Sequence, residues 1–354
     1  MKKTYINGLG CISAQKTFDT VFLEEAELNV NDTVLPLKTP VYKDFISPVA
    51  IRRMAKGVKN GIVASALALR EAKLETVEAI ITGTGMGCIE DSEKFLKSIL
   101  DNDEQFLTPT SFIQSTHNTV GGQIALGMHC KGYNLTYVNG SVSFESALYD
   151  AKMMIEEEEA SSILVGGIDE TADSATSLFQ LAGIIKEENQ SPYSVLESTT
   201  KGVVLGEGAT FFVLENEIKV HTIAEILDVA IFNRLDLEEV ESKIISFLAS
   251  NDLEINDIDA VLLGHNGDVD SDLYYKKLTD ITFSNIPQVY YKHLSGEYDT
   301  ASAFGLWVGS KIIQTQNIPD IAKINTLDKQ VYKTVLLYNQ RNGIDHSFTL
   351  ISKS

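Results

Sequence analysis

The residues with the clearest chemical potential lie around position 141, where a small hydroxyl side chain follows a glycine. Residues 134–147 read Asn-Leu-Thr-Tyr-Val-Asn-Gly-Ser-Val-Ser-Phe-Glu-Ser-Ala. This pattern predicts a buried strand over residues 135–138, a tight turn at Gly140 and a helix that begins at Ser141. We expect four side chains of this helix to face inward: Phe144, Leu148, Ala151 and Met153.

Two interpretations of Ser141 are open at this point. The free N–H groups and the positive end of the dipole at a helix start would stabilise an oxyanion beside a nucleophile. Alternatively, Ser141 is only the N-cap of the helix, a position that serine prefers. Because a strand, a glycine, a serine and a helix often follow one another, the local sequence alone favours the cap.

Length and composition indicate an ordinary globular protein. The 354 residues suggest two halves around a large core, and the apolar share of 44% is typical of a globular chain. No run of about 18 apolar residues occurs and the N-terminus lacks the features of a signal peptide, so we expect no membrane span and a cytoplasmic location. Cys11, Cys88 and Cys130 are too widely spaced for a disulfide framework or a metal site, and we expect no cofactor.

The charge balance excludes one class of partner and leaves another open. A net charge of −20 argues against nucleic acid, which binds broad basic faces. The local exception is residues 51–59, which contain Arg52, Arg53, Lys56 and Lys59. This cluster is interpreted either as a solvated helix face or as a docking surface for an acidic partner.

Strand-like and helix-like segments alternate along the chain, which indicates an α/β fold. Apolar runs predict strands at residues 79–83, 162–167, 210–214 and 260–263, and helical periodicity is found at 60–72 and 237–250. The glycines at positions 83–87 fit neither a phosphate loop nor a dinucleotide fingerprint.

Seven motifs occur in the order expected of one family. They are Tyr5-Ile-Asn-Gly-Leu-Gly, Gly83-Thr-Gly-Met-Gly, residues 109–125 with Asn118 and Gly122-Gln-Ile-Ala, Val138-Asn-Gly-Ser-Val-Ser, Val165-Gly-Gly-Ile-Asp-Glu, Gly206-Glu-Gly-Ala, and Tyr291-Lys-His-Leu-Ser-Gly-Glu. The whole chain resembles the β-ketoacyl-acyl-carrier-protein synthases of the thiolase superfamily. The resemblance implies a thiolase-like five-layered αβαβα sandwich of two duplicated halves, which we place at residues 1–215 and 216–354.

The resemblance also implies a catalytic site, from which this sequence departs. The family uses a cysteine nucleophile and two histidines, and here the nucleophile position is Ser141. His265 corresponds to the first histidine and Lys292 to the family lysine, but Glu297 stands in place of the second histidine. In the C-terminal loop that completes the oxyanion hole, Asn342 occupies the aromatic gatekeeper position and only Gly343 remains of the glycines.

These departures argue against condensing activity. A serine hydroxyl is a much weaker nucleophile than a thiolate and needs a neighbouring base. An ionised Glu297 could not donate a hydrogen bond to the enolate that decarboxylation creates, and Lys292 nearby would favour ionisation. Loss of one oxyanion donor typically costs about 10²–10³ in rate.

The function that the resemblance implies is therefore a degenerate ketosynthase-like subunit of fatty acid or polyketide biosynthesis. It resembles the chain-length-factor type, which pairs with an active ketosynthase and shapes the channel for a polyene or polyketide chain, including aryl polyenes. Three alternatives are open: a Ser141-dependent acyltransferase or priming enzyme with His265 as base, an active condensing enzyme with altered residues, and a docking or scaffolding module.

The implied partners are an acyl carrier protein and a ketosynthase subunit. Residues 134–138 are expected to pair with their equivalent across a two-fold interface, in a homodimer or a heterodimer. Arg52, Arg53 and Lys56 correspond to a basic helix at the mouth of the acyl channel, which predicts a docking face for the carrier.

Overall fold

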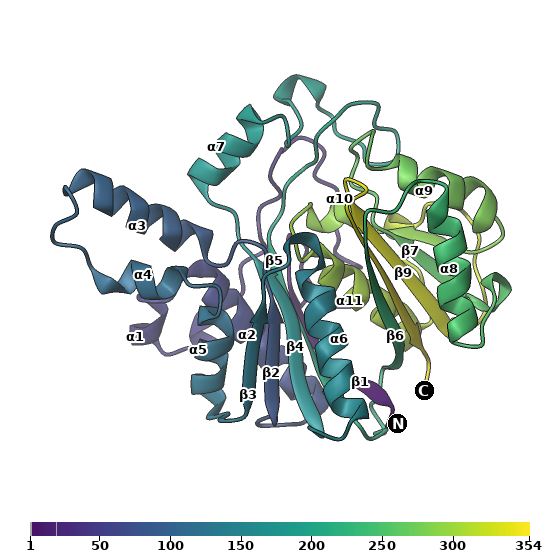
Figure 1. The fold of residues 1–354 in the computed structure, drawn as a ribbon, viewed down its shortest axis with the longest axis horizontal. Coiled ribbons are helices and arrows are strands. Elements are labelled where there is room, and N and C mark those ends of the chain that lie inside the picture. Colours follow the sequence, from purple (N-terminus) through teal and green to yellow (C-terminus); the bar gives the residue numbers. More distant parts are fainter. Residues whose placement is uncertain (1, 19) are drawn as a thin grey trace.

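A computed structural model describes residues 2–18 and 20–354, and it contains one continuous ten-stranded sheet with helices on both faces (Figure 1). The strands are β1 (Thr4–Ile12), β2 (Ala79–Gly83), β3 (Tyr133–Tyr137), β4 (Ser162–Asp169), β5 (Gly208–Glu215), β6 (Ala224–Asn233), β7 (Ala260–Leu263), β8 (Gln288–Tyr290), β9 (Thr334–Arg341) and β10 (Asp345–Ser352). Their order in the sheet is β3-β2-β4-β5-β1-β6-β10-β9-β7-β8.

The two halves of this sheet have the same topology. In the first, β2 is parallel to β3 and β4, and β4, β5 and β1 follow in antiparallel pairs. In the second, β7 is parallel to β8 and β9, and β9, β10 and β6 follow in antiparallel pairs. A short antiparallel contact between β1 and β6 joins the halves. This repeat confirms the predicted duplication, and the division of the chain at residue 215 stays a prediction.

The helices complete the five layers. They are α1 (Pro48–Ile51), α2 (Lys56–Ala72), α3 (Ile89–Asp101), α4 (Pro109–Ser115), α5 (Thr119–Met128), α6 (Ser143–Glu156), α7 (Asp173–Leu181), α8 (Glu239–Ser250), α9 (Leu273–Lys277), α10 (Lys292–Ser295) and α11 (Ala301–Thr315). Helices α6 and α11 lie in the centre, where their apolar residues pack against both halves of the sheet. Helix α2 packs on the outer face of the first half and α8 on that of the second.

The structure corrects two predictions about the segment around β3. The strand at 135–138 was expected to be buried, but β3 is the exposed edge of the sheet, with Leu135 36% exposed. In the helix that follows, Met153 faces solvent and Met154 faces the core with Phe144, Leu148 and Ala151. The reason is the helical period, because position 154 lies three residues after Ala151 and position 153 only two.

Helices α3 and α4 project from the body of the molecule (Figure 1). All thirteen residues of α3 are described and none of them is buried. The two helices contact each other through the rings of Phe95 and Phe112, whose centroids are 5.3 Å apart. No helix within the described residues is both long enough and apolar enough to span a bilayer.

Candidate active site

Ser141 lies in a short 3₁₀ turn, Gly140–Val142, that connects β3 to α6. Gly140 has a φ of +55°, a conformation that glycine adopts without steric cost. The interpretation of Ser141 as a helix cap is wrong, because α6 begins at Ser143 and the Ser141 side chain points elsewhere. Its buried hydroxyl donates a 2.7 Å hydrogen bond to Oδ2 of Asp345.

Asp345 comes from the C-terminal loop that was expected to complete an oxyanion hole. This loop is a tight hairpin between β9 and β10, with Asn342 and Gly343 both at positive φ. Asn342 is exposed at its tip and accepts a hydrogen bond from Ser271, so it does not act as a gate over Ser141. Gly343 is required because a Cβ there would lie 2.0 Å from the Tyr274 hydroxyl oxygen.

Glu297 is held in a buried ion pair with Lys292. The Lys292 ammonium lies 3.0 and 2.9 Å from the two carboxylate oxygens, and both side chains are almost fully buried. The amide of Asn266 donates a third hydrogen bond, of 2.7 Å, to Oε2 of Glu297. Three N–H donors therefore converge on this carboxylate, which acts as a hydrogen-bond acceptor in all three contacts.

The backbone on either side of Glu297 is fixed by two of the predicted motifs. Glu297 forms a backbone bridge to Leu205, the residue before the predicted Gly206-Glu-Gly-Ala motif. A Cβ on Gly206 would lie 1.9 Å from the carbonyl oxygen of Ser295, so the two glycine motifs contact each other directly, backbone to backbone. This close approach explains why glycine occurs at position 206.

His265 contacts Asp272 and Tyr275. Its Nδ1 lies 3.4 Å from Oδ2 of Asp272, and its ring packs on Tyr275 with centroids 4.6 Å apart. Nε2 is buried and has no hydrogen-bond partner among the described residues. The imidazole lines a cavity in which Ser198 and Val269 also lie and Ser141 does not. Within the described residues, the structure therefore does not pair His265 with Ser141.

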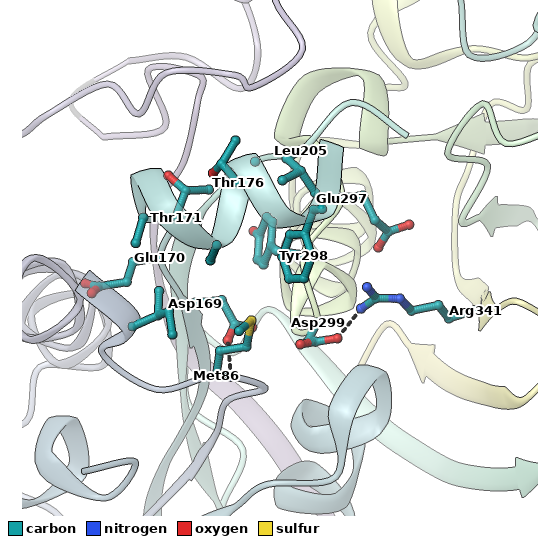
Figure 2. Close-up of a pocket in the computed structure, with 15 residues that line it drawn as sticks. Met86, Asp169, Glu170, Thr171, Thr176, Leu205, Glu297, Tyr298, Asp299 and Arg341 are labelled. Carbon is teal, nitrogen blue, oxygen red and sulfur yellow. Dashed lines mark hydrogen bonds and ion pairs between the residues drawn. The ribbon is translucent and has the colours of Figure 1, made fainter. Parts of the chain in front are cut away.

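A small cavity, lined by residues of both halves, lies between them (Figure 2). Its apolar wall comes from Met86, Ile89, Ala172, Ala175, Phe179, Leu205 and Tyr298. Its polar wall includes Glu297, Asp299 and Arg341. Arg341 forms an ion pair with Asp299, and Glu297 lies on the same side of the cavity (Figure 2). Of the predicted site residues, Glu297 lines this cavity, whereas Ser141 and His265 do not.

Asp169, at the end of β4, closes the floor of the cavity. Its Oδ1 accepts hydrogen bonds from the backbone N–H groups of Gly85 and Met86 at 2.8 and 3.3 Å. Its Oδ2 accepts from the N–H and hydroxyl of Thr300 at 2.9 and 2.8 Å. Burial and the nearby Asp299 raise the pKa of Asp169 to about 6, although these hydrogen bonds lower it. The predicted glycine loop is therefore already occupied by a carboxylate of the protein itself.

Arg341 and Asp299 are functional-site residues that the sequence analysis missed. Burial lowers the pKa of Arg341, but Asp299, Glu297, Asp169 and Asp345 together raise it above its ordinary value. Burial raises the pKa of Asp299, against the effect of Arg341. The glycine at position 85 is the sequence feature related to Asp299. A Cβ on Gly85 would lie 1.8 Å from the Asp299 carboxylate, so Asp299 in this position requires a glycine at position 85. The cavity is thus lined by several carboxylates around a guanidinium, and it lacks the open donors of an oxyanion hole within the described residues.

The basic cluster differs from the predicted helix face. Arg52 and Arg53 lie in the turn between α1 and α2, and both are exposed. Lys56 begins α2 and pairs with Glu207 at 2.7 Å, while it also donates to the carbonyl of Thr171. The cluster is therefore divided, because Lys56 turns inward to a buried carboxylate and half-buried Lys59 lies over the ring of Tyr42, whereas the two arginines face solvent.

The sequence profile described as "Beta-ketoacyl synthase, N-terminal domain" matches residues 42–219, half of the chain. The chain belongs to the β-ketoacyl synthase family. This assignment confirms the predicted resemblance. No curated protein matched the sequence.

Solved structures of this family share the fold over the whole chain. A structure described as the ishigamide ketosynthase/chain length factor has a TM-score of 0.80 and 18% identity, with 100% of this chain and 99% of that chain covered. A type II polyketide synthase acyl-carrier protein in complex with its ketosynthase bound to the hexaketide gives 0.72 and 15%, covering 100% of both chains. A ketosynthase in complex with its chain length factor from Xenorhabdus doucetiae gives 0.75 and 13%, covering 100% and 98%.

Proposed function

We propose that this chain is a chain-length-factor-like subunit of fatty acid or polyketide biosynthesis, which does not condense acyl units by itself and pairs with an active ketosynthase. The observation that carries the proposal is the ion pair between Glu297 and Lys292. At the position where the family places a histidine donor, this chain has a carboxylate that already accepts three N–H groups. An acceptor cannot stabilise the oxyanion that malonyl decarboxylation creates.

The environment of Ser141 supports the same conclusion. Its hydroxyl hydrogen is directed at a carboxylate, and neither the thiolate nor the imidazole base of the family is present beside it. The alternative function, a Ser141-dependent acyltransferase, requires His265 to accept the Ser141 proton. Since Asp272 holds the imidazole at a different cavity, the geometry gives this alternative no support.

Exposed apolar surface supports a partner subunit. The edge strand β3 presents Tyr133, Leu135 and the following Val138 to solvent, at 44%, 36% and 46% exposure. The projecting helices add Leu96, Leu100, Phe112 and Ile113. Large contiguous apolar patches usually mark interaction sites, and obligate interfaces bury about 2,000–5,000 Å². Homodimer and heterodimer both remain compatible with this surface, and the cytoplasm remains our predicted location.

The decisive experiment measures carbon dioxide release from radiolabelled malonyl-carrier protein. We expect no release above that of the matched variant Ser141→Ala for the purified chain. We also expect Ser141→Cys to stay inactive, because Glu297 would still be unable to donate. Release that requires Ser141 would overturn the proposal and restore a condensing enzyme with altered residues.

A second measurement identifies the partner. Intact mass spectrometry of the protein purified from its native host should show a stoichiometric second subunit of the ketosynthase type. Recovery of the chain alone, as a monodisperse monomer at micromolar concentration, would contradict the pairing.

We further propose that Arg52 and Arg53 contribute to docking of an acidic acyl carrier protein. They are exposed on a chain with a net charge of −20, and such charges act mainly on association rate over about 8–10 Å. Reversal of either arginine to glutamate should weaken carrier binding at low salt, whereas reversal of exposed Lys276 in the second half should not. Equal binding by all three variants at low salt would leave the arginines as solvated surface.

A further inference from the structure

The rim of the cavity between the halves consists of helices that are attached by carboxylates. Ile89 of α3 and three residues of α7, Ala175, Thr176 and Phe179, line this cavity. All residues of both helices are described, and none is buried. Besides the contact of Phe95 in α3 with Phe112 in α4, hydrogen bonds at the helix ends hold them in position, because isolated helices of this length are marginal in water.

Glu170 fastens α3 to the body of the protein. It follows β4 directly and is buried, and its two carboxylate oxygens accept hydrogen bonds from two different helix starts. One oxygen accepts from the N–H of Gly57 in α2 at 2.5 Å, and the other from the N–H of Glu90 in α3 at 3.0 Å. These groups belong to the first helical turns, whose N–H donors have no partner within their own helix.

Glu93 then fastens α7 to α3. This residue lies on α3, and its carboxylate accepts hydrogen bonds from the N–H groups of Ser174 and Ala175 at 3.1 and 2.6 Å. Both donors are in the first turn of α7, whose N-cap residue, Ala172, has no side chain that could cap it. The body, α3 and α7 are therefore connected in series by two carboxylates.

We propose that α3 and α7 form a gate over the cavity, which opens by release of the Glu170 and Glu93 caps while the five-layered sandwich stays folded. Opening breaks a few hydrogen bonds and exposes Cys88 at the margin of one apolar cluster, while the rest of the three main clusters stays buried, so its free energy is far below that of global unfolding. The inference goes beyond the proposed function, because it does not depend on which chemistry the cavity supports.

Cys88 provides a built-in reporter of this motion. It immediately precedes α3, is 1% exposed, and its Sγ lies 3.5 Å from the position of a Cβ on Gly57. Burial raises the pKa of the Cys88 thiol, and nearby Glu170 raises it further, which keeps it unreactive while the gate is closed. Cys11 is equally buried, but it lies on β1 in the central sheet and becomes accessible only on global unfolding.

The test follows labelling of Cys88 and Cys11 by DTNB in the native protein, in a Cys130→Ser background that removes the partly exposed third thiol. Peptide mass spectrometry assigns each site. We expect Cys88 to react at least tenfold faster than Cys11. Glu93→Ala and Glu170→Gln should each accelerate Cys88 about tenfold, which corresponds to loss of one or two hydrogen bonds, without a change at Cys11.

Glu78→Ala is the matched control, because Glu78 accepts a hydrogen bond from the N–H of Ser161, which is not part of the gate. This variant should leave the rate at Cys88 unchanged. The gate proposal would be contradicted by equal labelling rates at Cys88 and Cys11, or by a labelling rate at Cys88 that Glu93→Ala leaves unchanged. Should Glu170→Gln fail to fold, Glu93→Ala with amide exchange of Ser174 and Ala175 gives an independent answer.

Discussion

The duplicated topology allows the edge strand of the first half, β3, to be compared with its counterpart in the second half, β8. Strand β3 has five residues, and its outer edge is exposed. Strand β8 has three, and its outer edge is covered by the chain itself, through a bridge from Val289 to Lys323 and a 2.8 Å bond from the N–H of Ile324 to Gln288. The same fold thus closes one edge and leaves the other available, so we expect the proposed partner to bind the first half.

The turns that follow β3 and β8 also differ, in how their polar side chains are bonded. After β3, the turn presents Ser141, whose hydroxyl is bonded across the two halves to Asp345. After β8, the segment Lys292–Glu297 forms a buried ion pair within itself. The difference suggests that the second turn is a structural element and that the first one tolerates change.

The largest expected effect is at Glu297. Glu297→Ala would leave the ammonium of Lys292 buried and unpaired, which typically costs about 3–5 kcal/mol of unfolding free energy. The double variant Lys292→Met, Glu297→Leu should recover most of this loss, since it removes both charges. Urea denaturation measures both, and a loss below about 1 kcal/mol in the single variant would show that the pair is unimportant to stability.

The next effect concerns the open edge. Leu135→Asp places a charge on β3 and should weaken association about 100-fold, as expected for a central interface residue. Analytical ultracentrifugation of the chain, alone and with its ketosynthase partner, measures this change. The control is Val331→Asp, at a similarly exposed apolar position in the second half. Equal association by both variants would argue against an interface at β3.

A smaller, pH-dependent effect on stability is expected at Glu145 of the central helix α6. Helix α6 carries the buried Glu145, whose Oε2 has no partner among the described residues, although Ser347 donates to Oε1 at 2.8 Å. Burial raises the pKa of Glu145 above its ordinary value, opposed by the hydrogen bond from Ser347 and by the charge of Lys292. The stability that this group contributes is therefore fully present below its unfolded pKa of about 4.3, and is lost as pH rises through its folded pKa.

Glu145→Gln mimics the protonated form and should remove this dependence. The variant should gain stability relative to the natural chain at pH 8, and gain less at pH 5. Each unit by which the folded pKa is raised corresponds to about 1.4 kcal/mol. Urea midpoints at the two pH values give the comparison, and an equal change at both would refute it.

The smallest expected effect is at Ser141. Ser141→Ala removes one hydrogen bond to Asp345, which is partly exposed and can bond to water instead, so the loss should be about 0.5–1.5 kcal/mol. Thermal denaturation should reveal a small shift. A loss above about 3 kcal/mol would show that the first turn is as structural as the second.

Much of the fold was predictable because it depends on local patterns. The strands at 79–83 and 260–263 agree with β2 and β7, since short apolar runs bounded by polar residues and glycine define their own ends. The exposed position of β3 was not predictable, because apolar residues in a strand pattern normally indicate burial within the same chain. An apolar edge strand and an apolar buried strand have the same sequence pattern.

The candidate site was predictable at the positions that family motifs mark, and not elsewhere. Ser141, Lys292 and Glu297 were identified from their neighbours in sequence, and the predicted proximity of Lys292 to Glu297 is confirmed. The acceptor for Ser141 is 204 residues away, at Asp345, and the partner of Arg341 is Asp299. The Ser141 pair follows from how the two halves are apposed and the Arg341 pair from how the second half folds, and no local pattern encodes either.

The pairing of β1 has a consequence for synthesis of the chain. Tyr5 pairs with Glu215, 210 residues later, and Thr4 pairs with Ile226. At about 5–20 residues per second, the ribosome needs roughly 10–40 s to supply these neighbours after β1 has emerged. During that interval the first nine-residue strand, which carries Ile6, Leu9 and Ile12, has no sheet to join. Until β5 and β6 are made, the apolar side chains of β1 lack their neighbours in the sheet, which makes this strand prone to aggregation during synthesis.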